Sequence, residues 1–154
     1  MKILRYSLVT ASLIVLTIAA TAQEKKIERS ALPSAVEKTV QTESRGATVK
    51  GFTTEVENGK RAYEAKMIVN GHSKDIEIAP DGSINEIEEE VAFNSLPTNV
   101  QTELTARAKG AKILKVESLK KKDKLVAYEA TILRGSRHGE IQVGPNGERL
   151  RHEE

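Results

Sequence analysis

An internal repeat is the feature that most limits how this chain can fold. The tetrapeptide Ala-Tyr-Glu-Ala occurs at residues 62–65 and again at residues 127–130, an offset of 65. Two further landmarks recur in the same order at nearly the same offset, namely Leu32-Pro33 with Leu96-Pro97 and Pro80-Asp81-Gly82 with Pro145-Asn146-Gly147. We therefore predict a duplicated module of about 64 residues.

The first residues have the pattern of a secretory signal peptide. Two cationic residues precede an apolar run over residues 8–20, and Ala20-Thr21-Ala22 fits the small-x-small rule for cleavage. The run is shorter than the roughly 20 apolar residues that a membrane anchor needs. We predict that residues 1–22 are removed by a cut between Ala22 and Gln23, which leaves a periplasmic or secreted protein with no membrane insertion.

Charge is balanced over the expected mature chain but divided between its halves. Residues 23–95, taken as the first repeat, carry 10 basic and 14 acidic groups, net −4. Residues 96–154, taken as the second, carry 12 and 8, net +4. A broadly basic nucleic-acid-binding protein is thereby disfavoured. Opposite charges would let the halves attract each other or stack head to tail.

Each repeat opens with the signals of a short amphipathic helix. Ser34 and Thr98 each follow a proline and can cap free backbone amides. Gly46 and Gly110 end the helical pattern at matching positions. The apolar residues at helical spacing are Val36 and Val40 in the first repeat and Val100, Leu104 and Ala108 in the second.

The rest of each repeat is typical of antiparallel hairpins. In the first repeat, dipeptides suited to type I′ turns predict four strands, at about residues 48–56, 61–69, 73–79 and 83–91. These dipeptides are Asn58-Gly59, Asn70-Gly71 and Asp81-Gly82. The second repeat follows the plan with turns at Asp123-Lys124, Gly135 to Gly139 and Asn146-Gly147. The predicted fold class is α+β, two tandem repeats of a helix and a four-stranded meander.

Period-2 alternation assigns one face of the predicted sheet to the helices. That face carries Tyr63, Ala65, Met67 and Val69 with Ile76 and Ile78, and in the second repeat Tyr128, Ala130 and Ile132 with Ile141 and Val143. Each module is small and would bury little surface alone. We therefore expect one eight-stranded sheet, joined edge to edge, with both helices on the same side.

The order of these motifs resembles that of the PepSY-like modules of exported bacterial proteins. Leu-Pro at a helix start, a Tyr-Glu-Ala strand, an Ile-x-Ile or Ile-x-Val strand and an Asp-Gly or Asn-Gly turn carry the resemblance, which extends from Leu32 to the C-terminus. The tandem arrangement is similar to the beta-lactamase-inhibitor-like group, in which two modules form one concave sheet. The resemblance implies a non-catalytic binding domain.

Catalytic and metal motifs are weak in this sequence. It has no cysteine nucleophile, Gly-x-Ser-x-Gly elbow or phosphate loop, so we predict no enzyme activity and no cofactor. His72 and His138 could bind a metal with Asp75 or Glu140, but no His pair supports this, and polar turn residues are favoured. The acidic run Glu86–Glu90 is interpreted as a solvated strand edge.

Function is expected on the sheet face away from the helices. Alternation assigns to it Glu64, Lys66, Ile68, Asp75 and Glu77 in the first repeat and Glu129, Thr131, Leu133, Glu140 and Gln142 in the second. Charged residues with isolated apolar anchors are typical of a protein-binding surface. The leading hypothesis is recognition of another exported protein, as an enzyme inhibitor or adaptor. The alternatives are a small-ligand or metal sensor in the envelope, a self-assembling structural protein, and an ordinary solvated sheet face.

Overall fold

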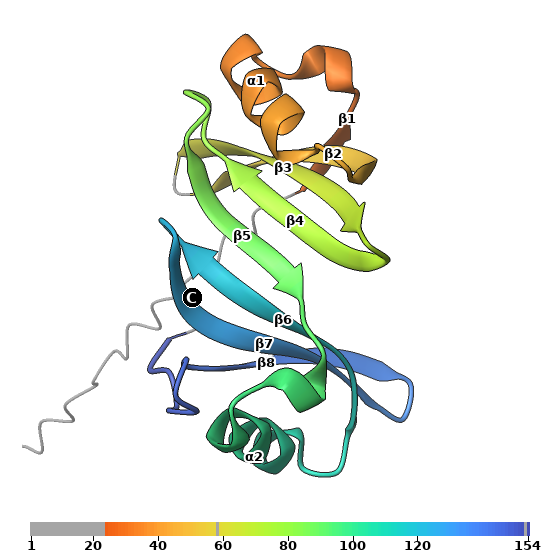
Figure 1. Ribbon diagram of the computed structural model, residues 1–154, viewed down its shortest axis with the longest axis vertical. Helices are drawn as coiled ribbons and strands as arrows, with labels where there is room; N and C mark the ends of the chain where they lie inside the picture. The colour runs from red at the N-terminus through yellow and green to blue at the C-terminus, as the bar shows by residue number, and fades with distance from the viewer. Residues whose placement is uncertain (1–23, 58, 153) are drawn as a thin grey trace, which may run out of the picture.

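Two α-helices and eight strands make up the described part of the computed structural model, which comprises residues 24–57, 59–152 and 154 (Figure 1). The predicted signal peptide and its cleavage site lie outside these residues. The elements are β1 (Lys25–Ile27), the 3-10 turn η1 (Arg29–Ala31), α1 (Ser34–Glu43), β2 (Thr48–Glu57), β3 (Lys60–Val69), β4 (His72–Ile78), β5 (Ile84–Glu90), η2 (Phe93–Ser95), α2 (Thr98–Ala108), β6 (Lys112–Lys121), β7 (Lys124–Arg134) and β8 (Arg137–Val143).

All eight strands form one antiparallel sheet in chain order, from β1 to β8. The two predicted repeats, residues 23–95 and 96–154, meet at the ladder between β5 and β6, which runs from Glu86 opposite Lys121 to Glu90 opposite Glu117. Across this ladder Lys120 Nζ lies 2.8 Å from a Glu89 carboxylate oxygen. The predicted edge-to-edge joining of the repeats is therefore confirmed.

The eight strands are distributed differently from the predicted four and four. Four strands follow α1 but three follow α2, and no strand follows Asn146-Gly147 within the described residues. The eighth strand is β1, which precedes α1 and pairs with β2. The same order of elements thus occurs twice: strand, 3-10 turn, helix and three strands. Lys25-Lys26-Ile27 is too short and too polar for β1 to stand out in the sequence.

Both helices lie on the same face of the sheet, as predicted. α1 packs on one cluster through Val36 and Val40, and α2 packs on a second through Val100 and Leu104. All of the strand residues predicted to face the helices, except Val69, belong to these two clusters. Ile76 pairs with Ile87, which pairs with Lys120, so the helix face continues from one half to the other. Directly paired residues point to the same side of a sheet.

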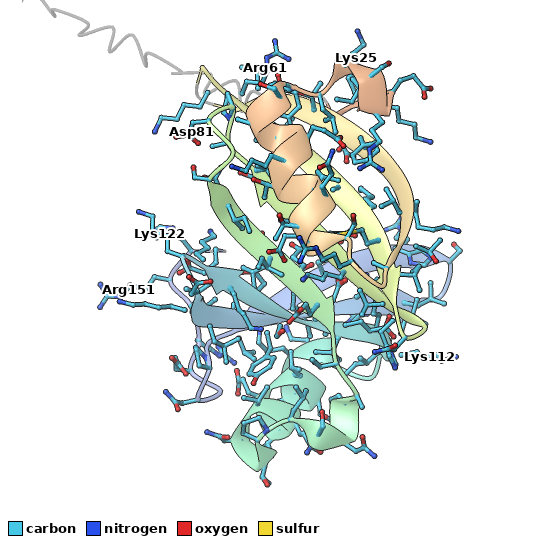
Figure 2. All side chains as sticks on the ribbon, turned by 45° about the horizontal axis from the view of Figure 1, so that its top comes forward. Lys25, Arg61, Asp81, Lys112, Lys122 and Arg151 are labelled. Atoms are coloured by element: carbon cyan, nitrogen blue, oxygen red, sulfur yellow. The ribbon has the colours of Figure 1, made fainter. Side chains whose placement is uncertain are left out.

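The turns follow the predicted positions, with three differences. The turn predicted over Gly135 to Gly139 comprises only Gly135 and Ser136, because β8 begins at Arg137 and includes His138. Asn70 and Gly71 both have positive φ, as a type I′ turn requires. In the turn before β5, however, positive φ occurs at Gly82 and not at Asp81. The turn between β6 and β7 is centred on Lys122 and Asp123, one residue earlier than predicted. In Figure 2 Asp81 and Lys122 lie on the same side of the molecule, and both line one groove there.

Matching glycine turns hold the start of each helix against the sheet. At Gly82 (φ +87) an added Cβ would lie 2.8 Å from the backbone oxygen of Ala35, in the first turn of α1. At Gly147 (φ +79) it would lie 2.7 Å from the backbone oxygen of Asn99 in α2. Thr39 Oγ1 also donates a hydrogen bond to the Gly82 carbonyl, at 2.6 Å. The repeated glycines therefore permit a close approach that a side chain would prevent.

We expect Gly82→Ala to lower the free energy of unfolding by about 2–4 kcal/mol, because left-handed strain and a backbone clash act together. Gly71→Ala is the matched control, since Gly71 has nearly the same φ (+88) and no described atom lies within 4 Å of its added Cβ. The control should cost about 1 kcal/mol. Urea denaturation compares the two, and equal losses would contradict the clash at Ala35.

Candidate functional site

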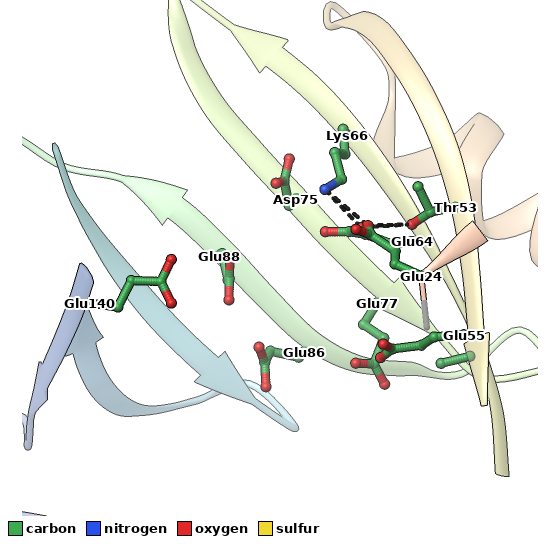
Figure 3. A pocket seen from close by; sticks show the side chains of 11 residues that line it. Glu24, Thr53, Glu55, Glu64, Lys66, Asp75, Glu77, Glu86, Glu88 and Glu140 are labelled. Carbon is green, nitrogen blue, oxygen red and sulfur yellow. Dashed lines mark hydrogen bonds and ion pairs between the residues drawn. The ribbon is translucent and has the colours of Figure 1, made fainter. Parts of the chain in front are cut away.

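The helix-free face of the sheet encloses a cavity of about 470 Å³ with an acidic lining (Figure 3). Among the described residues, eight carboxylates and one lysine contribute to that lining. The lining residues are Glu24, Thr53, Glu55, Ala62, Glu64, Lys66, Asp75, Glu77, Glu86, Glu88 and Glu140. We call this group the acidic cavity.

Curvature of the sheet brings distant strands to the acidic cavity. Glu55 lies on β2 and Glu140 on β8, with five strands between them in the sheet order. In a flat sheet these strands would be roughly 29 Å apart, at about 4.8 Å per strand. Because both residues line one cavity, the helix-free face is concave.

Strand pairing places carboxylates directly opposite one another on this face. Glu77 of β4 lies opposite Glu64 on one side and Glu86 on the other. In a neighbouring row Asp75 lies opposite Glu88. A third row continues into the second half, where Glu117 lies opposite both Glu90 and Glu129. Like charges directly opposite each other destabilise a sheet.

A network around Lys66 relieves part of this repulsion. Lys66 Nζ lies 3.1 Å from an oxygen of Glu24 and 3.1 Å from an oxygen of Glu64. The Thr53 hydroxyl lies within hydrogen-bonding distance of the same two carboxylates, at 2.9 and 2.8 Å. Burial works against the charge of Lys66, but hydrogen bonding to Glu24 and the charge of Glu64 raise its pKa to about 12.

Glu24 and Glu64 contact each other, and their pKa values move in opposite directions. The hydrogen bond from Glu64, with help from Thr53 and Lys66, lowers the pKa of Glu24 to about 2. Burial, together with the same contact to Glu24, raises the pKa of Glu64. Glu64, the more enclosed of the two groups, is therefore the more readily protonated.

Burial raises the pKa of further carboxyl groups on this face. Burial is the main cause that raises the pKa of Asp75 and of Glu86. Burial also raises the pKa of Glu88 to about 8, with further contributions from the charges of Glu117, Glu129 and Glu86. The cross-strand neighbour of Glu88, Leu119, is 1% exposed.

Side chains of the third acidic row are held by hydrogen bonds and an ion pair. Glu117 is 4% exposed, and its carboxylate contacts Lys115 Nζ at 2.7 Å and the Ser73 hydroxyl at 3.1 Å. Gln142 donates its side-chain amide to Glu129 at 2.7 Å. This row therefore forms the wall beside the acidic cavity.

The structure gathers half of the predicted site residues into the acidic cavity. The residues of the predicted set that line it are Glu64, Lys66, Asp75, Glu77 and Glu140. Glu129 and Gln142 lie in the neighbouring wall. Ile68, Thr131 and Leu133 are partly buried on their strands and are not part of the lining.

Sequence reasoning missed six lining residues, of which Glu86 and Glu88 are the most informative. The interpretation of Glu86–Glu90 as a solvated strand edge is wrong, because β5 lies between β4 and β6. Alternation within this run was a usable signal, since Glu86 and Glu88 share one face. Glu24, Thr53, Glu55 and Ala62 reach the cavity through the pairing of β1 with β2 and of β2 with β3, which no local pattern shows.

The described residues contain no group of three or more His, Cys, Asp or Glu side chains that could hold a metal ion. His72 lies with Nδ1 3.5 Å from Glu90, and Glu90 accepts the backbone amide of Ser73 at 3.0 Å. In the same part of the chain, the structure has no helix with the length and hydropathy of a membrane span.

Protonation of Glu88 predicts how stability depends on pH. The folded chain holds this proton up to about pH 8, whereas an unfolded glutamate loses it near 4.5. The folded state binds more protons between these values, so the free energy of unfolding should fall as pH rises from 4.5 to 8. We expect Glu88→Gln to be more stable than the natural chain by about 1–2 kcal/mol at pH 8, allowing for partial solvent screening, and nearly equal to it at pH 4.5.

Urea denaturation at pH 4.5, 6 and 8 measures this difference. Glu28→Gln, which removes a carboxylate from the exposed surface, is the control and should change stability by less than about 0.5 kcal/mol throughout. A Glu88→Gln variant that matches the natural chain at pH 8 would show that Glu88 is ionised there without cost.

Comparison with known proteins identifies the fold. No family model and no curated protein matches the sequence. Among solved structures, a protein named as periplasmic from Bacteroides eggerthii aligns with a TM-score of 0.62 and 16% identity, over 78% of this chain and 86% of that one. A DUF2874 family protein from Bacteroides uniformis aligns with a TM-score of 0.60 and 15% identity, over 77% and 86%.

A third structure connects the chain to the resemblance seen in its sequence. A protein named as BLIP-like from Bacteroides fragilis aligns with a TM-score of 0.56 and 19% identity, over 77% of this chain and 84% of that one. Identities this low show a shared fold. The chain therefore shares its fold with these Bacteroides proteins, one of which is named BLIP-like, as its tandem PepSY-like motifs predict.

Proposed function

We propose that this protein is an exported, non-catalytic binding module that recognises another envelope or secreted protein through the concave, helix-free face. One observation carries the proposal: carboxylates stand directly opposite one another across β3, β4 and β5. Neutral or opposite-charge pairs would give a more stable sheet. Proteins keep such destabilising pairs mainly at functional sites, so the paired carboxylates favour a binding role for this face.

The lining of the acidic cavity favours a partner that presents lysine or arginine side chains. A cation entering the cavity would be attracted by several carboxylates at once, in surroundings that are partly shielded from water. It would also favour the charged form of Glu64 and Glu88, whose pKa values are raised in the free protein. Binding of a cationic partner would therefore release protons, and its affinity should rise with pH.

The proposal also includes where the protein acts, outside the cytoplasm, and that it does not act as an enzyme. The N-terminal pattern predicts export, and proteins of the same fold are named as periplasmic. The BLIP-like neighbour supports a protein-binding role by its name, and inhibition of an enzyme is one form that this role can take. The other form is that of an adaptor between exported proteins.

Capture from an envelope extract tests the proposal. We expect the natural chain to retain an exported protein that Asp75→Asn/Glu77→Gln binds at least about tenfold more weakly, since two cavity charges are lost. The matched control is Glu28→Gln/Asp123→Asn, which removes two exposed charges outside the cavity and should retain the partner. Affinity should also fall as salt is raised.

The outcomes separate the alternatives. A partner retained equally by both double variants would contradict binding at the acidic cavity. Thermal stabilisation by a polyamine or a metal ion, with no protein captured, would replace the protein partner by a small cationic ligand. Circular dichroism of the variants checks that each is folded.

A further inference from the structure

The outer edge of β8 is open to a further strand. β1 and β8 are the two ends of the sheet, and β1 has only three residues. At β8, four consecutive residues, Arg137 to Glu140, are exposed. The ladder between β7 and β8 pairs all seven residues of β8 without a register shift.

The backbone groups that face outward along this edge can be assigned. Gly135 and Ser136 form a two-residue turn, and residues that flank such a turn exchange backbone hydrogen bonds, here Arg134 with Arg137. Because these exchanges occur at alternate residues, the backbone groups of His138, Glu140 and Gln142 point away from β7.

The position of Arg107 supports this assignment. Its guanidinium, from α2, donates a hydrogen bond to the carbonyl of Gln142, as it can only if that carbonyl points outward. No backbone group of another described residue outside the β7 ladder reaches His138 or Glu140. These two residues therefore leave a short row of open donors and acceptors.

The edge is complementary to itself. If two copies pair antiparallel about a twofold axis at Gly139, His138 of each lies opposite Glu140 of the other. Both side chains then lie on the helix-free face, where an imidazole N–H can donate to the carboxylate. The axis falls at a residue without a side chain, so nothing crowds the two strands where they cross it. Within the described chain, neither His138 nor Glu140 has an ion pair or side-chain hydrogen bond of its own.

Several devices that normally prevent edge pairing are missing from β8. Natural edge strands are blocked by proline, charged side chains (lysine above all), a bulge or very short length, and of these β8 has only the charges of Arg137 and Glu140. The sequence Arg-His-Gly-Glu-Ile-Gln-Val has no proline or lysine, and the strand is seven residues long. Bulges or irregularities occur instead in the ladders of β2 with β3, β4 with β5 and β6 with β7.

We propose that β8 is a self-association edge, at which a second copy of this chain adds its own β8 antiparallel about Gly139 and continues the sheet. Four backbone hydrogen bonds, from His138 and Glu140 of each copy, and two His138–Glu140 contacts hold the pair together. Since the twofold axis is perpendicular to the sheet, the concave faces of both copies point the same way. The contact area is small, so the dimer is weak and reversible.

Analytical ultracentrifugation of the processed, exported protein tests this inference over a wide concentration range. We expect a monomer–dimer equilibrium with a dissociation constant on the order of 10–100 µM. Glu140→Lys places a lysine opposite His138 and should raise that constant at least about tenfold. His138→Glu/Glu140→Lys restores opposite charges with their positions exchanged and should return it to within about threefold of the natural value.

Glu28→Lys makes the same change of charge at an exposed site outside β8 and is the control, which should dimerise like the natural chain. A chain that stays monomeric at every concentration overturns the inference. So does a dimer that Glu140→Lys leaves unchanged, because its contact must lie elsewhere. These outcomes do not depend on the capture experiment, which concerns the concave face.

Discussion

The ladder between β5 and β6 is the contact on which the rest of the structure depends. It joins the two predicted repeats into one sheet, and two lysines of β6 contact glutamates of β5 across it: Lys120 lies 2.8 Å from Glu89 and Lys121 lies 3.5 Å from Glu86. Its register also sets the faces of both halves. Ile87 is directed to the helix side and Glu88 to the other, so both helices share one face while the carboxylates collect on the opposite one.

The two faces of the sheet serve different purposes because they meet different energetic demands. On the helix face, apolar side chains are buried by α1 and α2, and their removal from water supplies most of the stability of such a fold. On the concave face, paired carboxylates oppose folding, and the chain limits that cost with Lys66, with hydrogen bonds to Thr53 and with the raised pKa of Glu88. A surface that is costly when empty is suited to a cationic partner.

Edge and face would act together if both proposals hold. A dimer joined at β8 presents two concave faces in the same direction, so a partner with two basic segments could engage both at once. Linked contacts of this kind raise the overall affinity beyond that of either site alone. Glu140 lies at the junction of the two surfaces, since it lines the acidic cavity and stands on the open edge of β8.

The sequence by itself determined the duplication, the two helices, most of the hairpins and the residues that face the helices. These features depend on turn chemistry and on periods of 2 and 3.6 residues, which neighbouring residues express directly. Tertiary structure alone decided that β1 is the eighth strand, that Glu86 and Glu88 lie inside the sheet, and that Glu24 and Glu140 share a cavity. Strand order and curvature arise from pairing between segments that are distant in the sequence. A local pattern of residues does not specify which other strand a given strand will pair with.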